Sequence, residues 1–325
     1  MDEKYPPFSV TPKALRLVSE IERLLGQVDL STLVRQEPML RRQNRVRSVK
    51  DSLAIEGNSL SLDQATAIFD KKRVVGPKNE IREIQNAIEA YAAAGKWRST
   101  SERDFKKAHG IMMAGLLASA GKYRAGAVGI MKGERISHIA PGAKQLPQLM
   151  GRLFSYAERN RDLHPLVMAA VLHYEIEYIH PFEDGNGRMG RLWQHLVLRE
   201  YHRFFETVPF ESVIKAKQKQ YYRVLELCDK AGDATRFVEF ALETTAIALK
   251  EVVTVTPRRR STTKERISFA ETVFKKKWFS RKDYIALFAD ISLPTASRDL
   301  AQAVKDKTMS SRGQKNQTEY RYRRA

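Results

Sequence analysis

The chain has 325 residues, of which 42% are hydrophobic and 29% are charged, and this composition excludes a globally disordered protein. Its single cysteine, Cys228, excludes an internal disulfide bond and a cysteine-rich metal site. The net charge of +19 is uneven, because residues 257–325 contain 18 basic and 7 acidic residues. This basic tail favours a polyanionic partner, nucleic acid first, although a solvated chain end would have the same composition.

The sequence also lacks the features of a membrane protein or an exported protein. No apolar run approaches the roughly 18 residues that a membrane-spanning helix needs. The first residues, Met1 to Lys4, include acids and lack the apolar core of a signal peptide. We therefore expect a cytoplasmic protein without a membrane partner, and the single cysteine suits that reducing compartment.

Apolar residues recur at helical spacing in several segments, which predicts a mainly α-helical protein. The helices expected from this pattern lie at about residues 14–25, 46–53 and 163–179. Ser61 and Gln64 fit a capping box, so one more helix should start there and end before Gly76. Residues 123–139 differ, because glycines and an alternating apolar pattern predict a short β-hairpin that turns near Lys132.

The end of the chain predicts a small separate domain. Residues 254–264 have no apolar periodicity and indicate a linker. After it we expect a helix over residues 281–288, a second helix within 291–300, and a strand–turn–strand over 309–322. Helix, turn, helix and wing is the order of a winged helix-turn-helix.

The segment with the most specific chemistry runs from His180 to Arg191 and reads HPFEDGNGRMGR. His180 is a natural proton acceptor near neutral pH. Asp184, four residues later, can bind Mg²⁺, which prefers carboxylate oxygens and substrate phosphates. A polar loop with a capping aspartate would be the alternative, but it does not explain the whole run.

The second half of this segment predicts an anion site. Gly185 and Gly187 precede an apolar helical pattern, so backbone N–H groups at a helix N-terminus can approach a phosphate. Arg188 and Arg191 can bind further phosphate oxygens. Together the residues offer a base, a metal ligand, an anion hole and a clamp.

This segment resembles the motif of the Fic family, His-x-Phe-x-Asp/Glu-Gly-Asn-Gly-Arg-x-x-Arg, at every fixed position. The resemblance covers roughly residues 40–250, including segments near the family's hairpin flap and the helix after the active site. It implies a mainly α-helical Fic core with a short hairpin flap, joined here to the winged-helix-like domain. The expected division is an N-terminal helical region (1–105), a Fic catalytic core (106–253), a linker (254–264) and a winged helix-turn-helix-like domain (265–325).

The resemblance implies a protein adenylyltransferase, which uses ATP and Mg²⁺ to move AMP onto a Tyr, Thr or Ser hydroxyl of a target or of itself. Some relatives transfer phosphate or phosphocholine instead, but the intact motif favours AMP. His180 would be the catalytic base and Asp184 the Mg²⁺ ligand, while Phe182 would pack in the core. The implied nucleotide-binding residues are Gly185, Asn186, Gly187, Arg188, Met189, Gly190, Arg191 and Tyr222.

A second motif concerns regulation. Ser52 to Gly57 is similar to the family's inhibitory motif, Ser/Thr-x-x-x-Glu-Gly/Asn. The resemblance implies that Glu56 pairs with Arg191 and denies it to the γ-phosphate of ATP. Alone, the pattern would equally fit a helix end with a solvated glutamate. Some relatives use this glutamate to activate water and remove AMP, and for Glu56 that question stays open.

The flap hairpin, about residues 128–136, predicts a docking edge for a target protein by β-augmentation, or else an ordinary exposed hairpin. His173, Glu177 and His180 share one helix face and would form half of a di-iron site, but the chain offers no second Glu-x-x-His. We therefore expect His173 to be a core residue. A homo-oligomer is compatible with the sequence.

The alternative function is a DNA-binding regulator that uses the Fic core as a sensor or modifier. The expected recognition helix carries Ser297 and Arg298, and the wing carries Arg312 and Lys315. A basic helical hairpin for self-association would explain the same residues.

Overall fold

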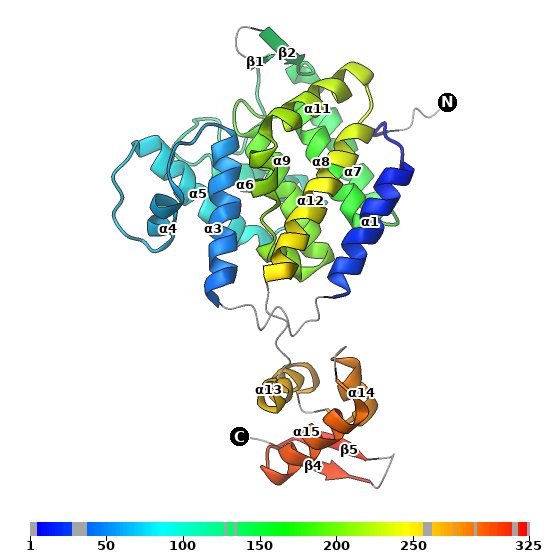
Figure 1. Cartoon of the computed structure of the whole chain (residues 1–325). Coiled ribbons are helices and arrows are strands. Elements are labelled where there is room, and N and C mark those ends of the chain that lie inside the picture. The colour runs from blue at the N-terminus through cyan, green and yellow to red at the C-terminus, as the bar shows by residue number, and fades with distance from the viewer. Residues whose placement is uncertain are drawn as a thin grey trace. The chain divides into compact units, whose positions relative to one another are not determined.

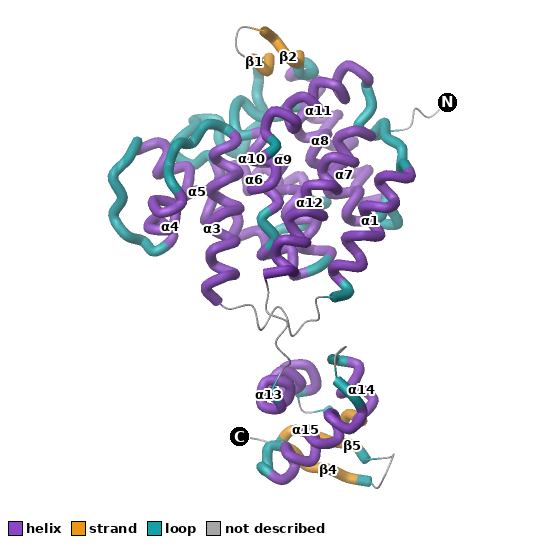
Figure 2. The backbone as a smooth tube through the Cα atoms, viewed as in Figure 1, coloured by secondary structure: helices purple, strands orange, loops and turns teal. Residues whose placement is uncertain are grey.

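The computed structural model describes residues 5–27, 38–126, 129–132, 135–255, 262–275, 277–288, 291–313 and 318–323. The chain forms two compact units: among the described residues the larger unit contains 5–23 and 38–252, and the smaller unit contains 24–27 and those from Val253 onward. Figure 2 shows that helices predominate and that strands are few. The predicted fold class, mainly α-helical with a short hairpin, is confirmed.

The larger unit is a helical assembly around two central helices, α8 and α9 (Figure 1). Its helices are α1 (Pro12–Leu25), α3 (Pro38–Ile55), α4 (Leu62–Phe69), α5 (Lys78–Ala93), α6 (Glu102–Met112), α7 (Leu146–Arg159), α8 (Pro165–Ile179), α9 (Asn186–Tyr201), α10 (Phe210–Ala216), α11 (Gln218–Ala231) and α12 (Thr235–Val255). Short 3₁₀ turns lie at Ala94–Lys96, Ala143–Gln145 and Arg203–Thr207. Helices α3 to α5, from the predicted N-terminal region, belong to the same compact unit as α6 to α11, and the division of the chain into four parts stays a prediction.

The central helix α8 is buried on nearly all sides. Apart from Pro165 and Tyr178, every one of its residues is buried, because the sequence of this helix is almost continuously apolar. Helix α9 crosses it and buries Trp193, whose indole N–H donates to the Ser99 carbonyl at 2.9 Å. Side chains carried by these two helices are therefore held by dense packing.

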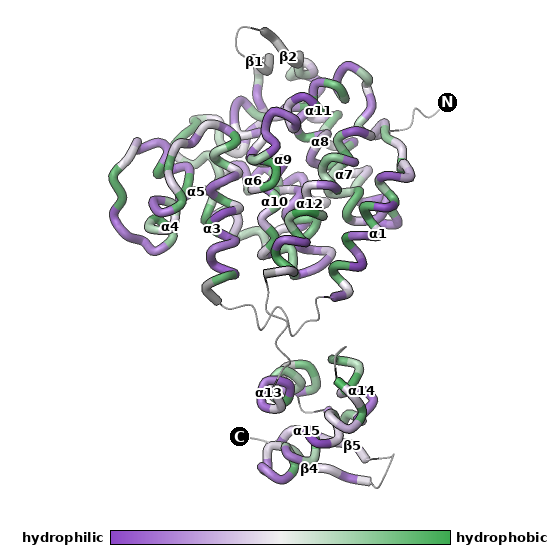
Figure 3. The backbone as a smooth tube through the Cα atoms, viewed as in Figure 1, coloured by the Kyte–Doolittle hydropathy of each residue, from purple (hydrophilic) through white to green (hydrophobic). Residues whose placement is uncertain are grey.

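Helix α3 is different in character, since hydrophilic residues make up much of its sequence (Figure 3). It buries a narrow apolar row, Val46, Val49 and Leu53, as its helical spacing predicts. The next helix, α4, starts with the predicted capping box: the Ser61 hydroxyl accepts from the Gln64 N–H, and the Gln64 side chain accepts from the Ser61 N–H.

The predicted hairpin is present as β1 (Gly129–Lys132) and β2 (Arg135–Ile139), which pair antiparallel. The register shifts between Ile130 and Met131. Figure 1 shows this hairpin at one end of the larger unit. The turn at 133–134, and residues 127–128 before the hairpin, lie outside the described residues, so the docking segment 128–136 is described only in part.

In its described segments, the smaller unit combines three helices and a three-stranded antiparallel sheet in the order β3–β5–β4. Its elements are α13 (Thr263–Phe274), β3 (Phe279–Ser280), α14 (Arg281–Ala286), α15 (Leu293–Lys305), β4 (Met309–Arg312) and β5 (Glu319–Tyr322). Buried apolar side chains such as Phe279, Leu300 and Met309 form its core. Helix, helix and wing follow in the expected order, and the sequence prediction lacked α13 and the two-residue β3. Residues 256–261, within the predicted linker, lie outside the described residues.

Candidate active site

His180 lies at the end of α8 in a left-handed conformation, with φ 50° and ψ 59°. Its N–H donates to the Ile176 carbonyl at 3.0 Å and thereby closes the helix. The ring atom Nδ1 lies 3.3 Å from the Glu177 carbonyl oxygen. A proton on Nδ1 would leave Nε2 as the proton-accepting nitrogen, which is the state a general base needs.

The loop after His180 is fixed by one amide side chain. Asn186 accepts from the Phe182 N–H at 2.8 Å and donates to the Phe182 carbonyl at 2.9 Å. Phe182 is fully buried, as predicted, and its ring stacks on His109 with centroids 3.6 Å apart. Gly185 has φ +86°, and a Cβ there would lie 2.9 Å from Met113 Sδ, so glycine is required.

Arg124 joins this loop to the base of the hairpin. It is buried, and its guanidinium donates to the carbonyls of His180 at 2.7 Å, Gly126 at 2.8 Å and Pro141 at 2.6 Å. The Arg124 N–H also donates to the Pro181 carbonyl. Arg124 lies in a segment whose sequence resembles the family's flap region, but the sequence did not predict this role.

Asp184, the predicted metal ligand, directly precedes the N-terminus of α9, and its side chain is 62% exposed. One carboxylate oxygen accepts from the Gly185 N–H at 2.6 Å and the other from Arg188 Nη2 at 2.8 Å. Within the described ranges no group of three His, Cys, Asp or Glu could hold a metal ion. Mg²⁺ here would therefore depend on Asp184 together with phosphate oxygens and water, which is its usual coordination.

The two motif arginines are both buried. Arg188 also donates to Glu83 at 3.1 Å, and its Nε has no hydrogen-bond partner in the described part of the chain. Arg191 Nε donates to the Ser52 hydroxyl at 3.0 Å, and Nη2 donates to the Ser52 carbonyl at 3.0 Å and to Glu56 Oε1 at 2.6 Å. The structure thus brings the two sequence motifs together.

Electrostatics keep Arg191 charged. Burial alone would lower the pKa of Arg191, but the negative charges of Glu56 and Glu177 raise it above its usual range. Burial would likewise raise the pKa of Glu177, but the hydrogen bond from His173 and the charge of Arg191 lower it to about 2. Glu177 therefore acts as a second anion beside Arg191, a role that the sequence did not reveal.

Glu177 and His173 are held in a buried network. The Tyr221 hydroxyl donates to Glu177 Oε1 at 2.7 Å and lies 3.1 Å from His173 Nε2. His173 Nδ1 lies 2.6 Å from the Gln194 amide oxygen. His173 is fully buried, as predicted for a core histidine. The ring packs on Gly190, where a Cβ would lie 2.6 Å from His173 Cδ2.

Three side chains from α10 and α11 hold the last carbonyls of α3. Lys215 Nζ donates to the Ala54 carbonyl at 2.6 Å, and Gln218 Nε2 donates to the Ile55 carbonyl at 2.7 Å. The Tyr222 hydroxyl also donates to Ile55, at 3.2 Å. These carbonyls have no partner within the helix, so the three donors cap α3 directly before Glu56. We call Lys215, Gln218 and Tyr222 the α3 clamp.

The other predicted nucleotide-binding residues lie in different surroundings. Met189 and Gly190 are buried in α9. At Gly187 a Cβ would lie 2.4 Å from Glu56 Oε1, so this glycine allows the Glu56 carboxylate to approach α9 closely. The roles of Met189, Gly190 and Tyr222 in nucleotide binding stay predictions.

The predicted DNA-binding residues lie in the smaller unit. On α15, Ser297 donates to the Leu293 carbonyl at 2.9 Å and accepts from Arg281, while Arg298 is exposed. On β4, Arg312 is 58% exposed and pairs with Glu319 at 2.7 Å. Lys315 lies outside the described residues.

A histidine at the end of a buried helix, followed by a glycine turn and a helix N-terminus with two arginines, defines a Fic-type site. Comparison with known proteins agrees. The Fic/DOC family profile matches residues 99–198. A Fic family protein from Desulfovibrio desulfuricans G20 of known crystal structure is 38% identical, with 98% of each chain covered and a TM-score of 0.75. This chain therefore belongs to the Fic family.

Relatives with functional names come from insects. The protein adenylyltransferase Fic of Drosophila mojavensis is 29% identical over 241 residues, which cover 69% of this chain and 46% of that protein. The protein of the same name from Culex quinquefasciatus is 30% identical over 210 residues, which cover 62% and 40%. The chain thus matches less than half of the length of these relatives.

Proposed function

We propose that this chain is a protein adenylyltransferase, which transfers AMP from ATP to a hydroxyl group of a target protein or of itself. The observation that carries this proposal is the position of His180 beside the N-terminus of α9, with Arg188 and Arg191 on the same helix. The names of the insect relatives support the same reaction.

His180 is the proposed base. Its Nε2 takes the proton of the target hydroxyl while that oxygen forms a bond to the α-phosphorus of ATP. The bond from the α-phosphorus to the bridging oxygen of the β-phosphate breaks, and pyrophosphate leaves. The backbone N–H groups at Gly185 to Gly187 and the helix dipole of α9 stabilise the phosphate charge.

Asp184 is the proposed Mg²⁺ ligand. An exposed carboxylate at a phosphate-binding helix end suits an ion that takes its other ligands from phosphates and water. When bound, Mg²⁺ neutralises phosphate charge. In the structure, Arg188 Nη2 donates to the Asp184 carboxylate and holds the Asp184 side chain toward α9.

Glu56 is the proposed brake. Its carboxylate accepts a hydrogen bond from Arg191, the residue that would otherwise bind the γ-phosphate. The carboxylate also lies close to the Gly187 backbone. ATP would then bind with its α-phosphate out of line for attack. A displacement of about 1 Å can cost on the order of 100-fold in rate, so no large movement is needed.

The test uses ATP labelled at the α-phosphate with wild type, Glu56→Gly, His180→Ala and the double variant. We expect weak labelling of the wild type, strong self-labelling of Glu56→Gly and no labelling once His180 is removed. ATP labelled at the γ-phosphate is the control, since equal transfer of that label would indicate a kinase. Equal labelling of wild type and Glu56→Gly would contradict the brake.

Removal of AMP by the same site is a second candidate activity. The Glu56 carboxylate is about one-third exposed and adjoins the phosphate-binding helix, where it could activate a water molecule. The purified, self-labelled protein, freed of ATP and given Mg²⁺, should release free AMP when Glu56 is present. Release at the same rate from Glu56→Gln would exclude this role.

The flap is the proposed docking edge for the target, because β1 and β2 form a two-stranded sheet with edges available for a further strand. Proline substitutions at Ile130 and Ile136 should lower modification of a target without lowering ATP binding. A labelling rate that does not change would favour docking elsewhere.

The proposed location is the cytoplasm, which suits ATP-dependent chemistry and the buried, unpaired Cys228. As a separate finding, none of the helices in the described ranges has the length and apolar content of a membrane span.

DNA binding by the smaller unit is a second proposed function, which rests on the exposed Arg298 of α15 and the exposed Arg312 of β4. Titration of the full chain with a fluorescent duplex at two salt concentrations tests it. Binding that weakens with salt and with Arg298→Gln supports the function. Absence of binding, or binding that does not change with salt, removes it.

A further inference from the structure

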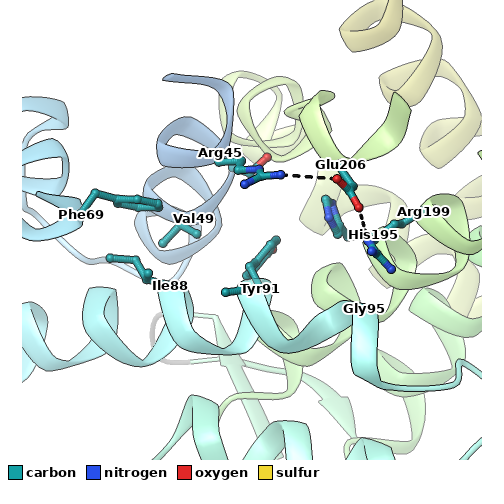
Figure 4. Close-up of a pocket in the computed structure, with 11 residues that line it drawn as sticks. Arg45, Val49, Phe69, Ile88, Tyr91, Gly95, His195, Arg199 and Glu206 are labelled. Carbon is teal, nitrogen blue, oxygen red and sulfur yellow. Dashed lines mark hydrogen bonds and ion pairs between the residues drawn. The ribbon is translucent and has the colours of Figure 1, made fainter. Parts of the chain in front are cut away.

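A cavity of about 220 Å³ lies in the larger unit between α3, α5, α9 and the 3₁₀ turn Arg203–Thr207. It is separate from the residues that surround His180. Figure 4 shows Val49, Phe69 and Ile88 along one wall and a group of charged and polar side chains along the other. The cavity therefore has an apolar half and a polar half, as small-molecule sites usually do.

The polar half carries excess positive charge. Arg199 Nε lies 2.7 Å from Glu206, Arg45 Nη2 lies 3.4 Å from it, and Arg203 Nε lies 3.8 Å from it. One carboxylate is thus shared by three guanidinium groups. Two of these arginines, Arg45 and Arg199, line the cavity and suit a ligand with a carboxylate or similar anionic group.

A buried polar atom in the cavity wall also lacks a partner. His195 is 5% exposed and lines the cavity, and its Nδ1 makes no hydrogen bond within the described residues. The nearest acid is Glu211, whose Oε1 lies 4.0 Å away. Buried nitrogen atoms are almost always hydrogen-bonded, so this nitrogen in the side chain of a cavity-lining residue leaves one hydrogen bond for a bound molecule or water to make. Burial and the charges of Arg199 and Arg45 lower the pKa of His195 to about 4, so the ring is neutral near pH 7.

The same two helices form this cavity and the proposed brake. Arg45, Ser48 and Val49 lie on α3 about two to three turns before Glu56, and His195 and Arg199 follow Arg191 on α9. The Ser48 hydroxyl donates to Glu211 at 2.8 Å beneath the cavity. A ligand that contacts both helices would bind best when α3 is docked, and by linkage it would stabilise the docked state.

We propose that this cavity binds a small organic anion with a flat apolar body, such as an aromatic carboxylate, and that its binding holds α3 against α9. The binding site stands by itself. Its regulatory consequence, stronger inhibition, rests on the proposed function.

The test of binding uses 4-fluorobenzoate as the probe, followed by fluorine NMR with the full-length protein. We expect the wild type to bind it, Arg45→Gln to weaken binding by about 10-fold, and the neutral 4-fluorobenzamide to bind far less. Arg47→Gln is the matched control, because Arg47 is an exposed arginine of the same helix outside the cavity. No binding up to about 10 mM, or equal weakening by both variants, would overturn the site.

The test of coupling is hydrogen exchange of the α3 amides, which does not depend on catalysis. Saturating 4-fluorobenzoate should slow exchange in α3 of the wild type and leave Arg45→Gln unchanged. Unchanged exchange in the wild type would overturn the coupling. If Glu56→Gly labels itself, the probe should also lower labelling of the wild type but not of Glu56→Gly. A chain that binds the probe yet never transfers AMP would refute the proposed function and leave the binding site standing.

Discussion

The catalytic loop and the end of α3 meet at Arg191, but they are held in place by different forces. The loop from His180 to Asn186 is fixed by buried contacts: Phe182 packs inside the core, and the Asn186 side chain bonds both the N–H and the carbonyl of Phe182. The end of α3 buries Leu53, Ala54 and Ile55 as well, but the residues around Glu56 also depend on polar contacts, from Arg191 and from the α3 clamp.

In the proposed mechanism this contrast would separate catalysis from control. A loop anchored by a buried aromatic ring and by buried hydrogen bonds cannot shift without a loss of stability, whereas the hydrogen bonds around the partly exposed Glu56 can be released at smaller cost. Substitutions in the loop should therefore lower stability together with activity, whereas substitutions at the end of α3 should change activity with little loss of stability. The predictions below test that difference, from the largest expected effect to the smallest.

Phe182→Ala should destabilise the protein by about 3–5 kcal/mol, because it leaves a cavity beneath the catalytic turn. Urea unfolding followed by circular dichroism measures this change. We expect activity to fall in parallel, also in the Glu56→Gly background. Phe8→Ala, a buried phenylalanine far along the chain from the motif, is the control for general destabilisation. Full stability in Phe182→Ala would mean that packing does not fix the loop.

Two buried titratable side chains, Glu211 and His195, should make the free energy of unfolding depend on pH. Burial raises the pKa of Glu211 to about 7, so its contribution to stability falls as the pH rises from about 4.5 to 7. Burial lowers the pKa of His195 to about 4, so its contribution falls as the pH drops from about 6.5 to 4. The two slopes oppose each other in the wild type.

Glu211→Gln removes the pH dependence of stability that comes from Glu211 and keeps the one that comes from His195. Its stability relative to the wild type should therefore worsen on acidification, by on the order of 1–3 kcal/mol between pH 7 and pH 4. Urea titrations at a series of pH values measure the difference. A stability difference that stays constant with pH would show that Glu211 does not retain its proton in the folded protein.

Substitutions in the α3 clamp should release the brake without unfolding the protein. Gln218→Leu removes one hydrogen bond to the Ile55 carbonyl, which is worth about 1 kcal/mol. Self-labelling should rise about fivefold, since 1 kcal/mol corresponds to roughly that change in an equilibrium. Lys219→Met, an exposed neighbour on α11, should label like the wild type. Equal labelling by both variants would show that the clamp does not hold Glu56.

Local patterns in the sequence predicted much of the fold and named most of the candidate site residues. Periodicity found α1, α8 and part of α3, and the run from His180 to Arg191 supplied the reacting groups in one stretch. Contacts between distant segments could not be predicted. Lys215 meets Ala54 across 161 positions in the chain, and neither residue belongs to a recognisable motif.

The cavity and the buried acids could not be predicted either, because they too depend on contacts between distant segments. His195 and Tyr91 come together only because α5 packs beside α9, with ring centroids 5.2 Å apart. The short strand β3 was missed for a different reason, since two residues are too few to show an alternating pattern.

In the proposed mechanism, the pairing of Glu56 with Arg191 inside one polypeptide would fix the ratio of inhibitor to enzyme at one to one. Overproduction or scarcity of the protein leaves that ratio unchanged, unlike a separate antagonist whose supply can run out. Tethering also gives the carboxylate a local concentration in the millimolar range or above. In the proposed mechanism the active fraction of the molecules would therefore not depend on gene dosage, and a change in conformation would set it.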